Sequence, residues 1–228
     1  MTDGPHSVQP APPASDRVRL RRKPDRGRYD RATIDAILDA ALVGHVGWVL
    51  DGQPYVTPTA IWRRGDRLYW HGSAGSRMVR ETKGGGPVCI TATILDGLVL
   101  ARSGTGHSMN YRSVMVLGCA YLVEDEAETL AALEAFVEHL YPGRWAELRP
   151  ATSNEVRQTA VLWADLAEAS AKIRATGVHD EPGDESWPAW AGVVPVTLIA
   201  GTPEPDEHVP AATLVPAYLS AARGRIER

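Results

Sequence analysis

One segment of the sequence combines small residues, hydroxyl groups and a cation in the manner of a phosphate-binding site. It spans residues 71–77, HGSAGSR, where a strand-like run ends and a short helix begins. Ser73 and Ser76 offer hydroxyls, the junction offers backbone N–H groups, and Arg77 offers a bidentate guanidinium. An ordinary helix N-cap followed by a surface arginine is the competing interpretation, and the spacing favours neither.

A second polar group opens the most apolar run of the chain, residues 111–123. Alternation along a strand places Tyr111 and Ser113 on one face and Arg112 on the other. A cation carried into a barrel or an interface needs a partner, and an anionic ligand or a carboxylate would serve equally well. Tyr111 and Arg112 are therefore candidate site residues.

A proline lies inside another strand-like run, at Thr57-Pro58-Thr59. Because proline donates no backbone hydrogen bond, nearby backbone groups are left to bond a flat heteroaromatic ring, although a plain edge strand is the competing account. His71 and His107 lie beside these segments. A lone histidine is more often structural than a ligand, but their positions keep both as candidates.

The familiar nucleotide, zinc and hydrolase signatures are absent from the sequence. The 228 residues carry a formal charge of -4, which argues against a nucleic-acid partner; a local basic cluster in residues 17–31 is most simply a solvated lead-in. No apolar run approaches the roughly 20 residues that span a bilayer, and no signal peptide is recognisable. We therefore expect a cytoplasmic protein with no membrane partner.

The pattern of elements predicts a mainly β protein with α-helices. A helix is expected after Asp30 and another over residues 126–140, and short strands fill much of the chain between residues 45 and 199. Asp96-Gly97 predicts a tight hairpin between two of these strands. The expected domains are a disordered arm at 1–25, a barrel at 26–200, and a tail at 201–228 with a short helix.

Residues 26–195 resemble the pyridoxamine 5'-phosphate oxidase-like flavoprotein superfamily, and within it the nitroimidazole-resistance (Nim-type) flavin-nucleotide-binding proteins. The resemblance rests on five segments taken together: RATI at 31–34, YWHGS at 69–73 with Ser76-Arg77, DGLV at 96–99, NYRSVMV at 110–116 and PGRW at 142–145. It implies an FMN-binding split β-barrel, a six-stranded Greek-key barrel with peripheral helices. It also implies a homodimer with two equivalent interface sites.

The resemblance also assigns roles to residues. The FMN phosphate would meet Ser76 and Arg77, with Ser73 beside them and Lys83 as a supplementary charge. The isoalloxazine would be lined by two segments, Thr57 to Thr59 and Thr91 to Thr93. His71 matches a histidine that lies by the cofactor in Nim-type proteins and is linked to turnover.

These inferences lead to an FMN-dependent oxidoreductase that passes electrons from a reduced nicotinamide to a small electron-poor acceptor, such as a nitroaromatic. His71 would donate a proton, and Tyr111 and Arg112 would shape the acceptor pocket. Residues 187–192, WPAWAG, lack the basic residues of true pyridoxamine-phosphate oxidases, so oxidation of that substrate is not expected. The alternatives are a haem enzyme with His71 or His107 as metal ligand, and a non-catalytic flavin-binding or redox-sensing module.

Overall fold

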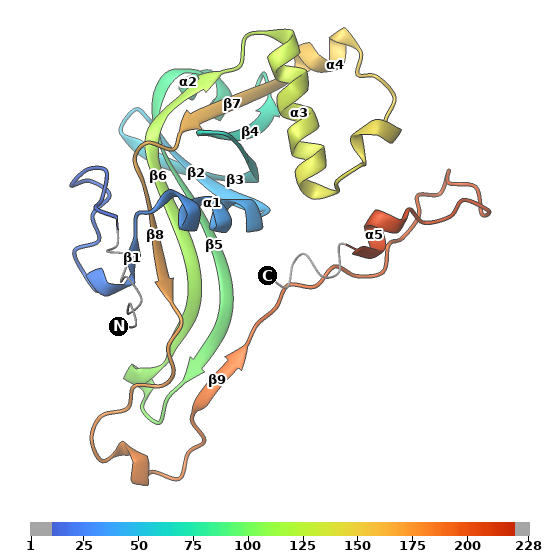
Figure 1. The fold of residues 1–228 in the computed structure, drawn as a ribbon. Coiled ribbons are helices and arrows are strands. Elements are labelled where there is room, and N and C mark those ends of the chain that lie inside the picture. The colour runs from blue at the N-terminus through green and yellow to red at the C-terminus, as the bar shows by residue number, and fades with distance from the viewer. Residues whose placement is uncertain (1–10, 222–228) are drawn as a thin grey trace, which may run out of the picture.

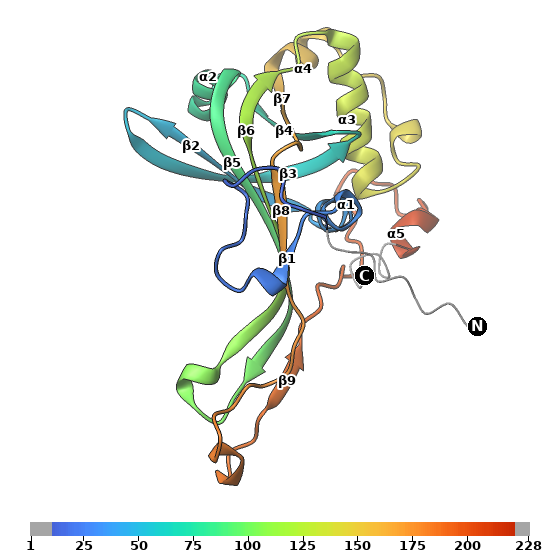
Figure 2. The same cartoon turned by 60° about the vertical axis from the view of Figure 1, so that its left-hand side comes forward.

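The computed structural model describes residues 11–221, and its centre is a sheet that closes on itself (Figures 1 and 2). Six strands pair in the cyclic order β6–β7–β4–β3–β2–β5, and the pairing of β5 with β6 closes the ring. They are β2 (Val43–Leu50), β3 (Gln53–Arg64), β4 (Arg67–Ser73), β5 (Gly84–Leu100), β6 (Ser108–Leu122) and β7 (Thr159–Asp165). The predicted six-stranded split barrel is confirmed.

The two longest strands, β5 and β6, continue past the barrel and form an arm (Figure 1). On one side of this arm β8 (Ala169–Arg174) pairs with β6, and β1 (Gly27–Arg28) pairs with β8. On the other side β9 (Gly192–Pro195) pairs with the end of β5. The last part of the chain therefore returns to the barrel along the outer edge of β5.

Helices lie around the barrel. They are α1 (Arg31–Ala40), α2 (Arg77–Thr82), α3 (Glu126–Leu140), α4 (Ser153–Gln158) and α5 (Ala217–Ala221), with 3-10 turns η1 (Pro24–Arg26), η2 (Gly104–Gly106), η3 (Trp145–Glu147) and η4 (Asp184–Ser186). The predicted cap of α1 is present, because the Asp30 carboxylate accepts from the Thr33 N–H at 2.8 Å. Between residues 11 and 221, no helix is both long and apolar enough to cross a membrane.

The first half of β4 is buried on both faces, which explains its run of three large apolar residues, Leu68 to Trp70. Leu68 and Trp70 point into the barrel core, whereas Tyr69 packs outside the barrel with Trp62 and Phe136 under α3. Trp62 and Trp70 are both fully buried. This packing fixes the end of β4, where the predicted phosphate segment begins.

Two local predictions are wrong. Asp96-Gly97 is not a hairpin turn: β5 runs through it, and the register against β6 shifts there by one residue, which makes a β-bulge. Pro58 does not interrupt β3, because it lies within the strand opposite His45 of β2. Pairing with a long partner strand overrides the turn signal in the first case.

The N-terminal region is partly attached to the barrel within the described residues. Val18 is buried, and Arg17 forms a 2.9 Å ion pair with Glu168. Residues 1–10 of the predicted arm and 222–228 of the predicted tail lie outside the described residues.

Candidate functional site

Half of the predicted cofactor-binding residues line one cavity of about 480 Å³, together with His71; it is named here the Arg77 cavity. It lies between the β2–β3 hairpin, the end of β4 and the start of α2. Its walls are Trp48, Tyr55, Val56, Thr57, Pro58, Thr59, His71, Gly72, Ser76, Arg77 and Met78. The structure thus brings together two segments that the sequence singled out separately.

Arg77 supplies the charge of this cavity. Its guanidinium lies 5.2 Å from the centre of the Tyr55 ring, and no acidic side chain among residues 11–221 pairs with it. Ser76 is the N-cap of α2, where its Oγ accepts from the Val79 N–H at 3.3 Å. The cavity therefore presents a cation without a carboxylate, together with a serine hydroxyl.

Aromatic rings form the opposite wall. Trp48 stacks on Tyr55 with ring centres 4.7 Å apart, and its Nε1 donates to the Thr57 Oγ1 at 3.1 Å. Thr59 donates through its hydroxyl to the His71 carbonyl oxygen at 3.4 Å. The first two contacts hold the Thr57–Thr59 segment to β2 and the third holds it to β4, so that the wall is preformed.

His71 lies at the inner end of the cavity, where its ring contacts Trp62 at 5.7 Å and Phe136 at 5.1 Å between ring centres. Its Nδ1 is buried and has no hydrogen-bond partner in the described part of the chain. Burial lowers the pKa of His71 below its ordinary value. The imidazole is therefore neutral near pH 7.

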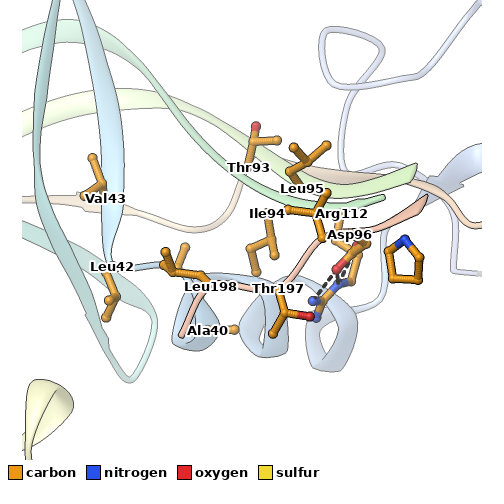
Figure 3. A pocket seen from close by; sticks show the side chains of 13 residues that line it. Ala40, Leu42, Val43, Thr93, Ile94, Leu95, Asp96, Arg112, Thr197 and Leu198 are labelled. Atoms are coloured by element: carbon orange, nitrogen blue, oxygen red, sulfur yellow. Dashed lines mark hydrogen bonds and ion pairs between the residues drawn. The ribbon is translucent and has the colours of Figure 1, made fainter. Parts of the chain in front are cut away.

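Arg112 lies elsewhere, in a second cavity of about 530 Å³ that Figure 3 shows. This cavity is named here the strap cavity, after residues 195–198 that form one of its walls. Arg112 donates from Nε to Asp96 Oδ2 at 3.0 Å and from Nη2 to Oδ1 at 2.8 Å. Hydrogen bonds to Asp96 raise the pKa of Arg112. Asp96 thus supplies a carboxylate partner, one of the two kinds of partner that the sequence left open.

The remaining candidates are spread over both sides of the barrel. Thr93 lines the strap cavity, and Thr91 lies opposite His45 on β2. Ser73 ends β4 and its carbonyl accepts from the Ser76 N–H at 2.9 Å. Lys83 is the C-cap residue of α2 and lines hollows that it shares with Glu124.

Two further candidates lie away from the Arg77 cavity. Tyr111 is on β6 in register with Leu95 and Arg174, and it lines neither cavity. His107 is exposed on the loop after η2, where its Nδ1 is 2.9 Å from the Ser103 carbonyl oxygen. Only His71, of the two histidines considered, belongs to the Arg77 cavity.

Several residues of these sites were missed by the sequence reasoning. Trp48 and Tyr55 could have been found, since they pair across a short hairpin at Asp51-Gly52 and the alternation of β2 buries Trp48. Phe136 and residues 195–198 carry no local signal, because distant segments bring them to the sites.

Comparison with known proteins shows the family to which the sequence and the fold are similar. The sequence profile of the family described as Pyridoxamine 5'-phosphate oxidase matches residues 30–173. No curated protein matches the chain. Among solved structures, the flavocytochrome Anf3 from Azotobacter vinelandii is 42% identical, with a TM-score of 0.85, over 92% of this chain and 97% of its own.

Two other solved structures are informative. The FAD and heme binding protein from Mycobacterium smegmatis is 34% identical, with a TM-score of 0.82, over 86% of this chain and 96% of its own. A protein described as a 5-nitroimidazole antibiotic resistance protein from Bacteroides thetaiotaomicron is 25% identical, with a TM-score of 0.53, over 64% and 86%.

Proposed function

The chain belongs to the pyridoxamine 5'-phosphate oxidase family, and from this premise we propose that it is a flavin-dependent oxidoreductase. It binds a flavin nucleotide, FMN or FAD, in the Arg77 cavity and passes electrons from a reduced nicotinamide to a small electron-poor acceptor, such as a nitroaromatic. The observation that carries the proposal is Arg77, a cation with no carboxylate partner among the described residues, in a cavity walled by aromatic and threonine side chains.

The residues of the cavity fit a flavin nucleotide. Arg77 and the Ser76 hydroxyl suit a phosphate group, because a guanidinium binds phosphate oxygens in a bidentate manner. Thr57 and Thr59 lie on the adjoining strand, where their hydroxyls and the backbone around Pro58 suit the polar edge of the ring system. The volume of about 480 Å³ lies within the usual range for cofactor sites.

A bound flavin would supply the hydride and electron chemistry, and the protein would position the reactants. His71 can hold a proton at Nε2 toward the cavity, since placing it there leaves buried Nδ1 as an acceptor rather than as an unpaired N–H. Its lowered pKa keeps the ring neutral, so the proton that it offers comes from a neutral imidazole. Contacts with the rings of Trp62 and Phe136 fix the orientation of the imidazole.

The proposed unit is a homodimer. On the outer face of β2, Val49 is exposed while Val46 and Trp48 point inward, and exposed Val56 lies diagonally across from it on β3, in register with Gly47. Exposed apolar side chains that adjoin one another commonly mark an interface. Light scattering on the purified protein tests this, and a monomer would contradict it.

The absorption spectrum of the purified protein tests the main proposal. We expect flavin bands, flavin released by acid that chromatography identifies as FMN or FAD, and oxidation of a reduced nicotinamide when a nitroaromatic is added. A protein that holds flavin without turnover would instead be a redox-sensing or flavin-binding module. A protein that takes up no flavin when reconstituted would overturn the proposal.

Haem is the second candidate cofactor, because two relatives with 42% and 34% identity are described as a flavocytochrome and as an FAD and heme binding protein. His71 is the histidine in the Arg77 cavity that could ligate iron through Nε2. A ligating histidine usually donates its other N–H to an acceptor, and Nδ1 of His71 has none among the described residues. A Soret band that is lost in His71→Ala but kept in His107→Ala would assign this ligand.

A further inference from the structure

The strap cavity is built from parts of the chain that are far apart in sequence. The end of α1 and the start of β2 form one wall, β5 with Arg112 of β6 forms another, and residues 195–198 cross over them (Figure 3). That last segment lies outside residues 30–173, which the family profile matches. The cavity therefore depends on a C-terminal extension of the family's barrel.

The β-bulge in β5 holds this extension in place. The pairing of β9 with β5 ends opposite Gly97, and the Val196 N–H then donates to the Asp96 carbonyl oxygen at 3.1 Å. A side chain at Gly97 would come within 3.1 Å of the Val194 carbonyl oxygen, so glycine permits this close approach. Asp96 thus binds the strap through its backbone and Arg112 through its carboxylate.

The chemistry of the strap cavity suits an uncharged ligand. Its cation, Arg112, is already neutralised by Asp96 through bonds of 2.8 and 3.0 Å. The other polar side chains on its walls are the hydroxyls of Thr93 and Thr197, and Thr197 lies beside the ion pair in Figure 3. The rest of the lining is aliphatic: Ala40, Ala41, Leu42, Val43, Ile94, Leu95, Pro195, Val196 and Leu198.

The two cavities are neighbours on one sheet. Val43 of the strap cavity precedes Gly44, and Gly44 lies directly opposite Thr59 of the Arg77 cavity. Val43 and Thr59 therefore lie on neighbouring strands, but their side chains point to opposite faces of the sheet, because successive residues of β2 alternate.

We infer that the strap cavity binds a neutral aromatic molecule that carries an oxygen acceptor, such as a quinone, and that this molecule is the electron acceptor. The aliphatic walls contact its ring, and a threonine hydroxyl donates to its oxygen. The step balances: a bound flavin would pass on two electrons from the reduced nicotinamide, the nicotinamide and solvent would each account for one proton, and the quinone would leave as a hydroquinone. The acceptor role rests on the proposed function, whereas the binding site does not.

Equilibrium dialysis with oxidised, flavin-reconstituted full-length protein tests the site, with 2,3-dimethyl-1,4-naphthoquinone as probe. Ala40→Trp fills the cavity from the exposed end of α1, and Ala36→Trp places the same side chain on an exposed position of that helix outside the cavity. We expect the dissociation constant to rise about tenfold or more in Ala40→Trp and to stay unchanged in Ala36→Trp.

A second variant and a charged probe sharpen the test. Thr197→Val keeps the shape of the strap and removes a hydroxyl, so we expect binding a few-fold weaker, on the order of one lost hydrogen bond. A sulfonated analogue of the quinone should bind more weakly than the neutral probe. Any of three outcomes would overturn the inference. The first is that Ala40→Trp binds the quinone as the wild type does, and the second is that the sulfonated analogue binds as tightly as the neutral probe. The third outcome is that the wild type binds no quinone because a second copy of the chain covers the cavity.

The flavin spectrum of the same samples separates the two proposals. If the protein binds the quinone but takes up no flavin, the binding site is supported and the proposed function is wrong. If it binds flavin but not the quinone, the proposed function is unaffected and the inferred binding site is wrong.

Discussion

The Arg77 cavity and the strap cavity each contain one arginine, but the two arginines differ in their electrostatic surroundings. Arg77 lies over the edge of an aromatic wall without a carboxylate partner in residues 11–221. Arg112 is bound by Asp96 through both of its carboxylate oxygens. An unpaired guanidinium attracts an anion, whereas a paired one leaves only dipoles and apolar surface for a ligand. The same residue type therefore indicates a phosphate site in one cavity and a neutral ligand in the other.

The cavities also differ in how the chain builds them. The Arg77 cavity uses two compact stretches, 48–59 and 71–78, whose members already adjoin one another in hairpins. The strap cavity needs segments from four parts of the chain. A site made by local pairing can be recognised in a sequence, and a site made by distant segments cannot.

The largest expected effect is on flavin binding by Arg77→Ala. Loss of the charge-assisted bonds to phosphate should weaken affinity by about 10- to 100-fold, since such bonds contribute roughly 1.5–3 kcal/mol. Arg80→Ala, one turn along α2 and exposed, is the matched control and should bind as wild type. Fluorescence titration of each apoprotein with flavin measures both affinities. If Arg77→Ala and Arg80→Ala bind flavin equally well, Arg77 does not bind the phosphate and the proposed difference between Arg77 and Arg112 is wrong.

Asp96→Asn should reduce the difference between the two arginines, because it removes the negative charge that pairs with Arg112. Removing the carboxylate charge takes away the ion pair between Asp96 and half-buried Arg112, which should lower the free energy of unfolding by about 1–2 kcal/mol. The strap cavity of this variant should then bind the sulfonated quinone more tightly than the wild-type cavity does. Chemical denaturation and dialysis measure the two effects; Asp66→Asn, in an exposed ion pair with Arg31, is the control for the loss of an acidic charge.

Thr57→Val tests the preformed wall of the Arg77 cavity. The change removes the acceptor of the Trp48 indole N–H and should lower the free energy of unfolding by about 1 kcal/mol. Thr57→Ser keeps the hydroxyl and should retain most of that stability. If the valine and serine variants unfold alike, the hydrogen bond does not support the wall.

The smallest expected effect is a pH dependence due to His71. Because burial lowers its pKa in the folded protein, the unfolded chain takes up a proton first as the pH falls through about 6.5. Stability should therefore decrease on acidification from about pH 7 toward the lowered pKa. His71→Phe should remove this component, and exposed His107→Phe should not. Thermal melts across this pH range decide it; identical profiles would show that His71 is not held neutral.

The amino-acid sequence by itself determined the features that depend on interactions between residues close together along the chain. Strand alternation and turn signals predict the barrel, the Asp30 cap predicts α1, and residues 71–77 predict the cluster around Ser76 and Arg77. Each rests on interactions between residues that are close in sequence, or on pairing of consecutive strands.

The tertiary structure alone decided the rest. The sequence could not choose between a ligand and a carboxylate for Arg112, and its answer, Asp96, lies on a bulge that local signals presented as a hairpin. Nor could it bring Phe136 to His71 or residues 195–198 to the end of α1. These contacts join segments whose separation in sequence leaves no periodic or spacing signal, so only the packing of the folded chain reveals them.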